Sequence, residues 1–204
     1  MSIDRLDEED QPDTPAKEPK AEESPSGLID KNLFKSRTVL LFGEINDKVA
    51  RAVTAQLIAL SSDSNKPIRM FINSPGGHVE SGDTIFDIIR FVRAPVHVIG
   101  TGWVASAGAH IFIGAKKENR FCLPFTRFLL HQPLGGVRGQ ASDITIEAEE
   151  ILKMRERLNR EIAAETGQTF EKVVHDTERN YWLGAEEAKA YGLVSRVVSN
   201  ASEV

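Results

Sequence analysis

The chain has 204 residues, of which 41% are hydrophobic and 27% are charged, a composition that fits one globular domain with an ordinary core. No apolar run approaches the roughly 20 residues that cross a bilayer, and the polar first residues do not resemble a secretory signal. We therefore expect no membrane association and a cytoplasmic location. The single cysteine, Cys122, excludes an internal disulfide and a zinc site built from several cysteines.

The net charge of −5 is concentrated at the start of the chain. Residues 1–26 carry nine acidic and three basic side chains, so the rest of the chain sums to +1, which argues against a nucleic-acid partner. Residues 1–27 are acidic and rich in proline, and we expect a disordered tail that serves either solubility or a regulatory contact. Residues 28–199 are predicted to form one domain, and residues 200–204 a flexible C-terminus.

Strand and helix patterns alternate from residue 38 onward. Strands are predicted at 38–42, 68–72 and 96–99, and helical stripes with apolar residues at 49–60 and 85–92 separate them. Asn46 or Asp47 can cap the first of these helices. Such βαβ units join with right-handed crossovers into a mostly parallel sheet. We therefore predict an α/β fold whose functional loops lie at the carboxyl ends of the strands.

The longest helical pattern covers residues 139–166 and ends at Gly167. From residue 142 to residue 165 this helix would measure about 35 Å. A helix of that length projects beyond a compact domain unless another chain covers it. The sequence therefore predicts an oligomer.

The turn Asn-Ser-Pro-Gly-Gly at 73–77 follows a predicted strand and precedes a helix. Its two glycines let the backbone present N–H groups to an oxyanion or a phosphate, although an ordinary strand-to-helix turn explains the pattern as well. The turn lacks the Lys-Ser/Thr of a P-loop and the glycine spacing of a dinucleotide site. Both kinds of nucleotide site are therefore excluded.

Two residues farther along have the chemistry of a serine hydrolase. Ser106 lies among small residues where a helix could begin, and it is either a helix cap or a nucleophile. In the second case the N–H of Ala107 would join that of Gly77 in an oxyanion hole. His131 ends an apolar run and is either a structural histidine or a general base.

The polar stretch at 174–183 is either a surface turn or a source of groups that orient His131. The sequence contains no histidines or cysteines at the spacing of known metal sites, which argues against metal catalysis.

Five motifs in this order resemble the Clp protease proteolytic subunit family, ClpP. They are Ser-Pro-Gly-Gly at 74–77, Ala-Ser-Ala-Gly-Ala at 105–109, Arg-Phe-Cys-Leu-Pro at 120–124, His-Gln-Pro-Leu-Gly-Gly at 131–136 and Asp-Thr-Glu-Arg at 176–179. The resemblance covers roughly residues 35–199. It implies a crotonase-like α/β domain with a projecting handle, made of a strand and the long helix, at about 135–166.

The same resemblance implies an activity and partners. The chain would form two stacked heptameric rings and act as a serine endopeptidase that hydrolyses unfolded polypeptides to short peptides inside a chamber. An AAA+ unfoldase of the ClpX or ClpA type would feed that chamber and use the ATP. The subunit itself would then need no cofactor and no metal.

The resemblance also assigns roles to residues. Ser106 matches the nucleophile and His131 the general base, while the third catalytic position falls on Asn180, where the family usually has aspartate. An asparagine can hold the tautomer of His131 but supplies no charge to stabilise the imidazolium, so we expect slower acylation. Asp176, one turn earlier, is a substitute orienter.

Further positions match the oxyanion hole, the substrate cleft and the contact between rings. The backbone donors of the oxyanion hole would be Gly77 and Ala107. The cleft would include Gly76, His78, Pro133, Leu134, Gly135 and Gly136. The ring–ring contact would include Glu178, Arg179, Arg138 and Gln140.

Two other functions compete with this interpretation. Asn180 and an altered segment at 28–34 fit a weakly active structural or regulatory subunit that needs an active ClpP paralogue in a mixed particle. A crotonase-like acyl-CoA hydratase or isomerase would share the oxyanion hole. The sequence disfavours it, because Ser106 stands where such an enzyme needs a carboxylate.

Overall fold

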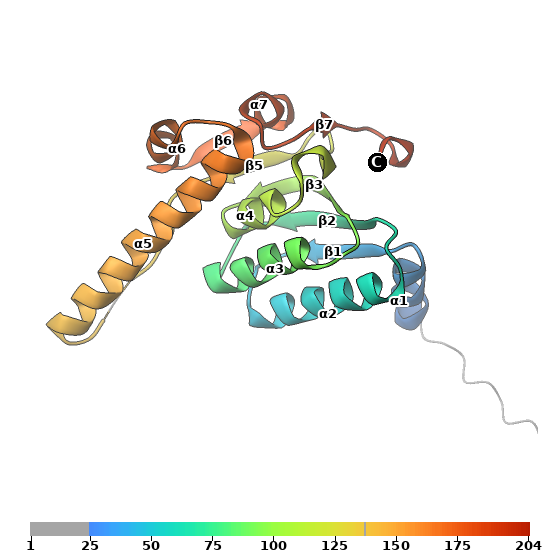
Figure 1. Ribbon diagram of the computed structural model, residues 1–204, viewed down its shortest axis with the longest axis horizontal. Coiled ribbons are helices and arrows are strands. Elements are labelled where there is room, and N and C mark those ends of the chain that lie inside the picture. The colour runs from blue at the N-terminus through green and yellow to red at the C-terminus, as the bar shows by residue number, and fades with distance from the viewer. Residues whose placement is uncertain (1–24, 137) are drawn as a thin grey trace, which may run out of the picture.

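The computed structural model describes residues 25–136 and 138–204. The described helices are α1 (Pro25–Lys35), α2 (Asp47–Asp63), α3 (Val79–Phe91), α4 (Ala107–Ile113), α5 (Ala141–Thr166), α6 (Phe170–Thr177) and α7 (Ala185–Tyr191), with 3-10 turns η1 (Lys117–Asn119) and η2 (Ala201–Glu203). The strands are β1 (Thr38–Phe42), β2 (Ile68–Ser74), β3 (Val96–Ala105), β4 (Arg120–Cys122), β5 (Arg127–Leu130), β6 (Tyr181–Gly184) and β7 (Arg196–Val197). Helices α2, α3 and α4 lie along one face of the sheet, and α5 extends away from the body (Figure 1).

The sheet is mainly parallel, as the βαβ pattern predicts. Strands β1, β2, β3, β4 and β7 are neighbours in that order, and β5 pairs with β3 in parallel. Strand β6 alone runs antiparallel, against β5. The α/β fold and its parallel sheet are therefore confirmed.

Local chemistry explains the boundaries of two predicted helices. The side chain of Asn46 accepts a hydrogen bond from the N–H of Val49 at 3.0 Å and so caps the start of α2. At the other end of the domain, Gly167 adopts a left-handed conformation with φ of 81° and ends α5. Both residues have the role that the sequence predicts for them.

Strand β3 changes partners along its length. Its residues 98–100 pair with β4, whereas residues 103–105 pair with β5. The pairing with β2 shifts register between these two parts, and Gly102 there has a φ of 60°. The kink directs the end of β3, and with it the start of α4, toward β5.

The long helix α5 is attached to the body only at its C-terminal part. Residues 141–150 are all exposed, and the buried side chains are Asn159, Ile162 and Thr166. Exposed apolar residues on this helix include Ile144 and Ile146, at 41% and 58% exposure. A helix with exposed apolar residues fits the expectation that another chain covers it.

The strand half of the predicted handle is absent from the described residues. Residues 131–136 and 138–140 form no strand, although Gly135 lies beside Ile151 of α5, with 3.2 Å between the Ile151 Cδ1 and the position of a Cβ on Gly135. A strand requires backbone partners, and none of the described strands lies beside this segment to supply them. The handle here is the long helix and an unpaired segment beside it.

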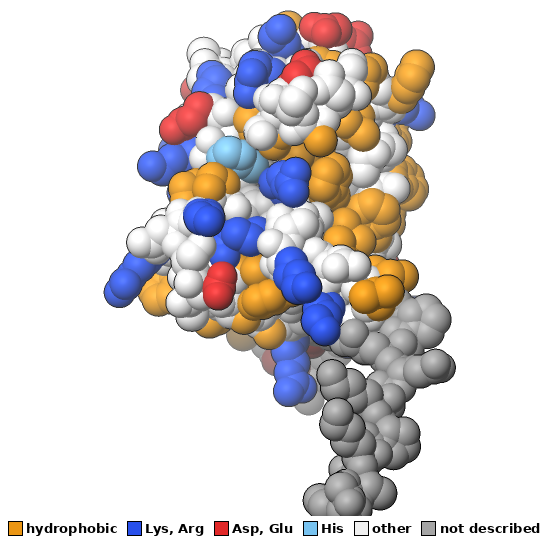
Figure 2. Space-filling view, turned by 90° about the vertical axis from the view of Figure 1, so that its right-hand side faces the viewer, with side chains coloured by type: hydrophobic (Ala, Val, Ile, Leu, Met, Phe, Trp, Pro, Cys, Tyr) orange, Lys and Arg blue, Asp and Glu red, His pale blue; other side chains and the backbone are white. Residues whose placement is uncertain are grey.

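The far face of the sheet leaves apolar side chains open to a neighbour. Leu40 and Phe42 of β1 and Trp103 of β3 are exposed, because α2, α3 and α4 cover the opposite face. Apolar side chains also gather along one side of the view in Figure 2, where Lys and Arg side chains are spread over the rest. Open apolar surface of this kind is typical of a subunit that binds other chains.

The two chain ends differ from the predicted boundaries. Helix α1 begins at Pro25, so the last residues of the predicted tail are helical, and residues 1–24 lie outside the described residues. At the other end, where a flexible C-terminus was expected at 200–204, residues 201–203 form the 3-10 turn η2. The Glu203 carboxylate stabilises this turn by accepting hydrogen bonds from the N–H groups of Ser199 and Asn200. No helix in the described part of the chain is long and apolar enough to cross a membrane.

Candidate active site

Ser106 occupies a strained turn between β3 and α4. Its φ of 54° and ψ of −122° are rare for a residue with a side chain, and such strain is common at functional sites. Ser106 stands at the N-cap position of α4, but its hydroxyl makes no capping hydrogen bond. The helix-cap interpretation is therefore wrong, and the hydroxyl is left free for chemistry.

The glycine turn of residues 73–77 packs directly against Ser106. A Cβ on Gly76 would lie only 2.6 Å from the Cβ of Ser106, so glycine is required for this approach. Buried Ser74 fixes the turn, because its Oγ donates to the Gly43 carbonyl at 2.6 Å and accepts the Gly76 N–H at 3.1 Å. The role of Ser74 was not predicted, although its place in the Ser-Pro-Gly-Gly motif is the signal that could have shown it.

Gly77 is held by the segment that precedes α2. The N–H of Ile45 donates to the Gly76 carbonyl, the N–H of His78 donates to the Ile45 carbonyl, and both distances are 2.9 Å. A Cβ on Gly77 would lie 2.1 Å from the Ile45 carbonyl oxygen, and the φ of Gly77 is 151°. Only glycine fits here.

Two backbone donors beside Ser106 are free. Within the described part of the chain, the N–H groups of Gly77 and Ala107 have no hydrogen-bond acceptor. Ala107 is the first residue of α4, where an N–H has no intrahelical partner and the helix dipole favours negative charge. Free donors of this kind can stabilise an oxyanion that forms at Ser106.

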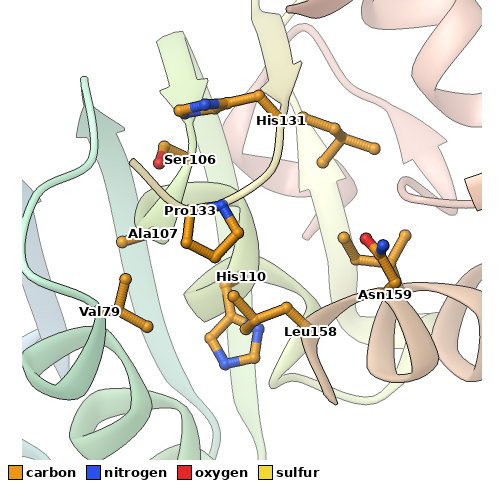
Figure 3. Close-up of a pocket in the computed structure, with 10 residues that line it drawn as sticks. Val79, Ser106, Ala107, His110, His131, Pro133, Leu158 and Asn159 are labelled. Atoms are coloured by element: carbon orange, nitrogen blue, oxygen red, sulfur yellow. The ribbon is translucent and has the colours of Figure 1, made fainter. Parts of the chain in front are cut away.

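His131 lies at the end of β5 and faces the same pocket as Ser106. The imidazole extends over Ser106 in Figure 3, and both residues line the pocket. Burial lowers the pKa of His131 below its ordinary value of 6.5, so the ring is neutral at pH 7 and able to accept a proton. A neutral histidine beside an unengaged serine hydroxyl is the pair that acyl transfer requires.

Asn180 and His131 flank the last residue pair of the β5–β6 ladder. Leu130 of β5 pairs with Tyr181 of β6, so His131 directly follows this pair and Asn180 directly precedes it. The N–H of Gln132 donates to the Thr177 carbonyl at 2.8 Å and keeps the two segments together. Asn180 is exposed.

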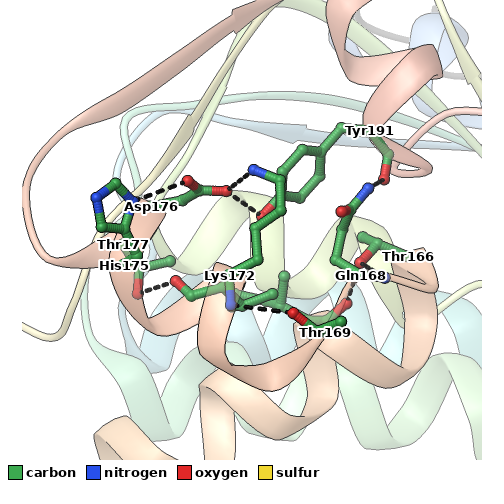
Figure 4. Close-up of polar contacts among 10 residues, drawn as sticks. Thr166, Gln168, Thr169, Lys172, His175, Asp176, Thr177 and Tyr191 are labelled. Atoms are coloured by element: carbon green, nitrogen blue, oxygen red, sulfur yellow. Dashed lines mark hydrogen bonds and ion pairs between the residues drawn. The ribbon is translucent and has the colours of Figure 1, made fainter.

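Asp176 has other partners. Its carboxylate binds the Lys172 ammonium at 2.6 Å and the Tyr191 hydroxyl at 3.0 Å, and it lies 3.4 Å from the His175 ring (Figure 4). Burial raises its pKa, but these three contacts outweigh burial and hold the pKa below its ordinary value. None of these contacts involves His131.

The predicted cleft residues divide into two groups. Pro133 lines the pocket of Ser106, and Gly76 packs against Ser106 itself. His78 instead directs its ring toward carboxylates, with Nε2 of the ring 3.1 Å from the carboxylate of Glu80. Leu134 is 84% exposed. Gly135 and Gly136 follow Leu134 along the unpaired segment beside α5.

The predicted ring-contact residues lie on the surface. Glu178 forms an ion pair with Arg155 of α5, which is a contact within the chain. Arg179, Arg138 and Gln140 are exposed and available to another subunit.

The other pocket walls were not predicted. They are formed by Val79, His110, Leu130, Leu158, Asn159 and Ile162. His110 follows Ser106 by one helical turn, and that spacing is the signal in the sequence that could have identified it. Within the described residues, no group of three His, Cys, Asp or Glu side chains could hold a metal ion.

Comparison with known proteins settles the family. Residues 21–201 match the Clp protease family. The chain belongs to this family. The Clp protease family is a family of serine-type peptidases.

Relatives in the Clp protease family are close over most of the chain. The chain is 59% identical to "ATP-dependent Clp protease proteolytic subunit 2" of Gluconobacter oxydans (strain 621H), over 100% of this chain and 94% of that protein. It is also 59% identical to "ATP-dependent Clp protease proteolytic subunit 3" of Rhizobium meliloti (strain 1021), over 92% of this chain and 96% of that protein.

Solved Clp protease structures have the same fold. An asparagine-to-aspartate mutant of ClpP1 from Listeria monocytogenes superposes with a TM-score of 0.80 at 52% identity, covering 85% of this chain and 98% of that one. The ClpP1 structure without that mutation gives a TM-score of 0.78, also at 52% identity, over 86% of this chain and 98% of that one.

Proposed function

We propose that this chain is the proteolytic subunit of an ATP-dependent Clp protease and hydrolyses unfolded polypeptides through Ser106. The observation that carries the proposal is the arrangement around one pocket. An unengaged serine hydroxyl in a strained turn stands beside two free backbone donors, and the neutral ring of His131 faces the same pocket.

The chemistry follows from these groups. Ser106 Oγ attacks the carbonyl carbon of the peptide bond while His131 takes its proton, and the N–H groups of Gly77 and Ala107 bind the oxyanion. His131 then returns the proton to the leaving amine, which yields an acyl-enzyme. Water, activated by the same histidine, hydrolyses that ester.

Asn180 is proposed as the residue that orients His131. Its amide oxygen accepts the N–H of the ring nitrogen that does not face Ser106, and so it holds the required tautomer. An amide adds no negative charge, so the imidazolium that forms during acylation gains less stabilisation than from a carboxylate. We therefore expect a Ser-His-Asn peptidase that is slower than its aspartate counterpart.

Assembly and partners form part of the same proposal. The exposed apolar residues of α5 and of the open sheet face support an assembly of identical subunits, for which we propose two stacked heptameric rings. The relatives named above are subunits of ATP-dependent proteases, so the partner that uses ATP is proposed to be an AAA+ unfoldase, and their numbered names make a paralogous subunit a further candidate partner. We propose a cytoplasmic location and no cofactor in the subunit itself.

One experiment tests the nucleophile and its activation together. The purified full chain is treated with a fluorophosphonate, and the adduct is located by mass spectrometry of the intact protein and of its peptides. We expect a single adduct on Ser106 and none in Ser106→Ala. An unmodified wild-type protein, or an adduct on another serine, would overturn the proposal.

A further inference from the structure

Three helices from different parts of the sequence form the walls of the pocket beside Ser106. Val79 is the first residue of α3, His110 lies in α4, and Leu158 and Ile162 belong to α5. In Figure 3, His110 and Leu158 lie at the opposite end of the pocket from Ser106 and His131. In the proposed reaction, a peptide attacked by Ser106 would place the side chain that precedes the cleaved bond in this pocket. The separation of the helices therefore limits how large that side chain can be.

Asp83 of α3 contacts both of the other helices. Its Oδ2 lies 2.6 Å from Nη2 of Arg157 in α5, and Nη1 of Arg157 donates to Oδ1 at 3.2 Å. The same Oδ1 lies 3.0 Å from Nε2 of His110 in α4. One carboxylate thus links α3, α4 and α5 beside the pocket that they form.

His110 depends on this carboxylate. The His110 ring is only 7% exposed and stacks on Phe86, with ring centroids 4.4 Å apart and an interplanar angle of 6°. Neither ring nitrogen makes an aligned hydrogen bond within the described residues, so the contact with Asp83 is the polar contact that positions the ring. Burial raises the pKa of Asp83, but the contacts with His110 and Arg157 outweigh burial and lower the pKa to about 2. Asp83 is therefore ionised across the physiological pH range.

Arg157 lies where α5 leaves the body. The next residues, Leu158 and Asn159, line the pocket, whereas residues 141–150 are all exposed. On the other side of α5, the Oδ1 of Asn159 accepts a hydrogen bond from the Thr177 hydroxyl at 3.0 Å. The helix is thus attached on two sides. On the α3 side, Asp83 supplies the contact beside the pocket, and an ion pair between Arg90 of α3 and Glu165 supplies a second contact at the C-terminal end of α5.

We propose that Asp83 is a specificity-determining residue, which fixes the width of the pocket beside Ser106 and so restricts the size of the side chain that precedes the cleaved bond. The proposal rests on the proposed peptidase function and deepens it. A carboxylate with a bidentate contact to Arg157 and a second contact to His110 draws both walls toward α3. Without that charge, the part of α5 beside the pocket and the His110 ring can move outward, while Arg90 and Arg120 still bind Glu165 at the C-terminal end of the helix, and the pocket admits larger side chains.

The test compares peptides that differ only in the residue before the cleaved bond, alanine or phenylalanine. Asp83→Asn keeps the shape of the side chain and removes its charge. We expect this substitution to shift the ratio of kcat/KM for the two peptides about tenfold toward phenylalanine. Glu156→Gln is the matched control, because Glu156 pairs with Arg160 on the exposed surface of α5, and it should leave the ratio unchanged. A ratio within twofold of the wild type in Asp83→Asn would overturn the proposal.

Two further measurements keep the result interpretable. Fluorophosphonate labelling of Ser106 in each variant reports the nucleophile separately, so unlabelled wild-type protein contradicts the peptidase function and not the role of Asp83. Arg157→Gln removes the same attachment from the other side, at a side chain that is 47% exposed. Arg157→Gln should shift the ratio of kcat/KM for the two peptides in the same direction. It therefore provides the test if Asp83→Asn fails to assemble. An unchanged ratio in a labelled, assembled Arg157→Gln protein would also overturn the proposal.

Discussion

The backbone N–H of Ser106 donates to the carbonyl of Leu129 at 2.9 Å, which ties the nucleophile's turn to the strand that leads to His131. The two side chains are therefore positioned by pairing between β3 and β5. Backbone pairing of this kind fixes both residues before any substrate binds, as efficient acyl transfer requires.

Ser106→Ala tests the chemical assignment directly. The substitution removes the attacking oxygen and leaves the strand pairing intact, so we expect peptide hydrolysis to fall by at least about a thousandfold. The mass of the assembled particle, measured by native mass spectrometry, should not change. Turnover that persists in the assembled variant would mean that another residue attacks the substrate.

Asn180→Asp tests whether the missing charge limits the rate. In the proposed arrangement, a carboxylate at position 180 stabilises the imidazolium of His131, so kcat for peptide hydrolysis should rise about tenfold or more. Asn200→Asp is a suitable control, because Asn200 caps η2, a role that aspartate also fills. If kcat is equal in Asn180→Asp and in the wild type, the absence of a carboxylate at position 180 does not limit the rate of peptide hydrolysis.

The pH dependence of kcat/KM follows from the burial of His131. The general base must be neutral, and burial lowers its pKa below 6.5, so activity should persist to a pH below 6.5 and fall only as the ring becomes protonated. In Asn180→Asp the new carboxylate raises this pKa, so the acidic decline should move to higher pH. A pH profile between about 4.5 and 8.5 for both proteins measures the two midpoints. Midpoints in the reverse order would contradict the assigned partner of His131.

Much of this architecture could be predicted because it depends on local chemistry. The strand at 38–42, the cap at Asn46 and the end of α5 at Gly167 follow from apolar periodicity, a side-chain acceptor and a glycine in a left-handed conformation. The free hydroxyl of Ser106 could not be predicted in this way. Its spacing fits a helix cap equally well, and only the backbone geometry of the turn decides between the two.

Residues whose roles depend on tertiary partners were harder to place. His78 follows the glycine turn in sequence, yet the carboxylates of Asp47 and Glu80 draw its ring away from the pocket. Asp83 and His110 are 27 positions apart and carry no shared motif, so their contact arises only when α3 packs against α4. The described residues 135–136 and 138–140, where the strand of the handle was predicted, likewise form no strand, because no neighbouring strand of the described residues pairs with them.

Gly77→Ala tests the oxyanion hole. The added Cβ would collide with the Ile45 carbonyl oxygen, and the turn must shift to relieve a 2.1 Å contact, so its N–H moves away from the oxyanion. We expect kcat to fall by about a hundredfold or more, as when one oxyanion donor is lost. Gly167→Ala also places an alanine at a positive φ, 81° at Gly167 against 151° at Gly77, but with no atom within 4 Å of its Cβ, at the C-terminal end of α5. Steady-state kinetics should show a much smaller loss in Gly167→Ala, and equal losses would mean that backbone strain alone explains both.

Ser74→Ala tests the support beneath the same turn. The Oγ of Ser74 is buried, donates to the Gly43 carbonyl and accepts the N–H of Gly76. Its removal leaves the buried N–H of Gly76 without this partner at a cost of about 1–3 kcal/mol, while the carbonyl of Gly43, an exposed residue, can bind water. The apparent melting temperature, measured at fixed protein concentration, should fall by several degrees, about 2–4 °C for each kcal/mol in a chain of this size. The kcat should fall as well, because Gly76 and Gly77 lose their anchor. Ser62→Ala removes an exposed hydroxyl that bonds only within α2, and it should leave both quantities unchanged. A normal kcat in a destabilised Ser74→Ala protein would show that the Ile45 contacts alone hold the oxyanion turn in place.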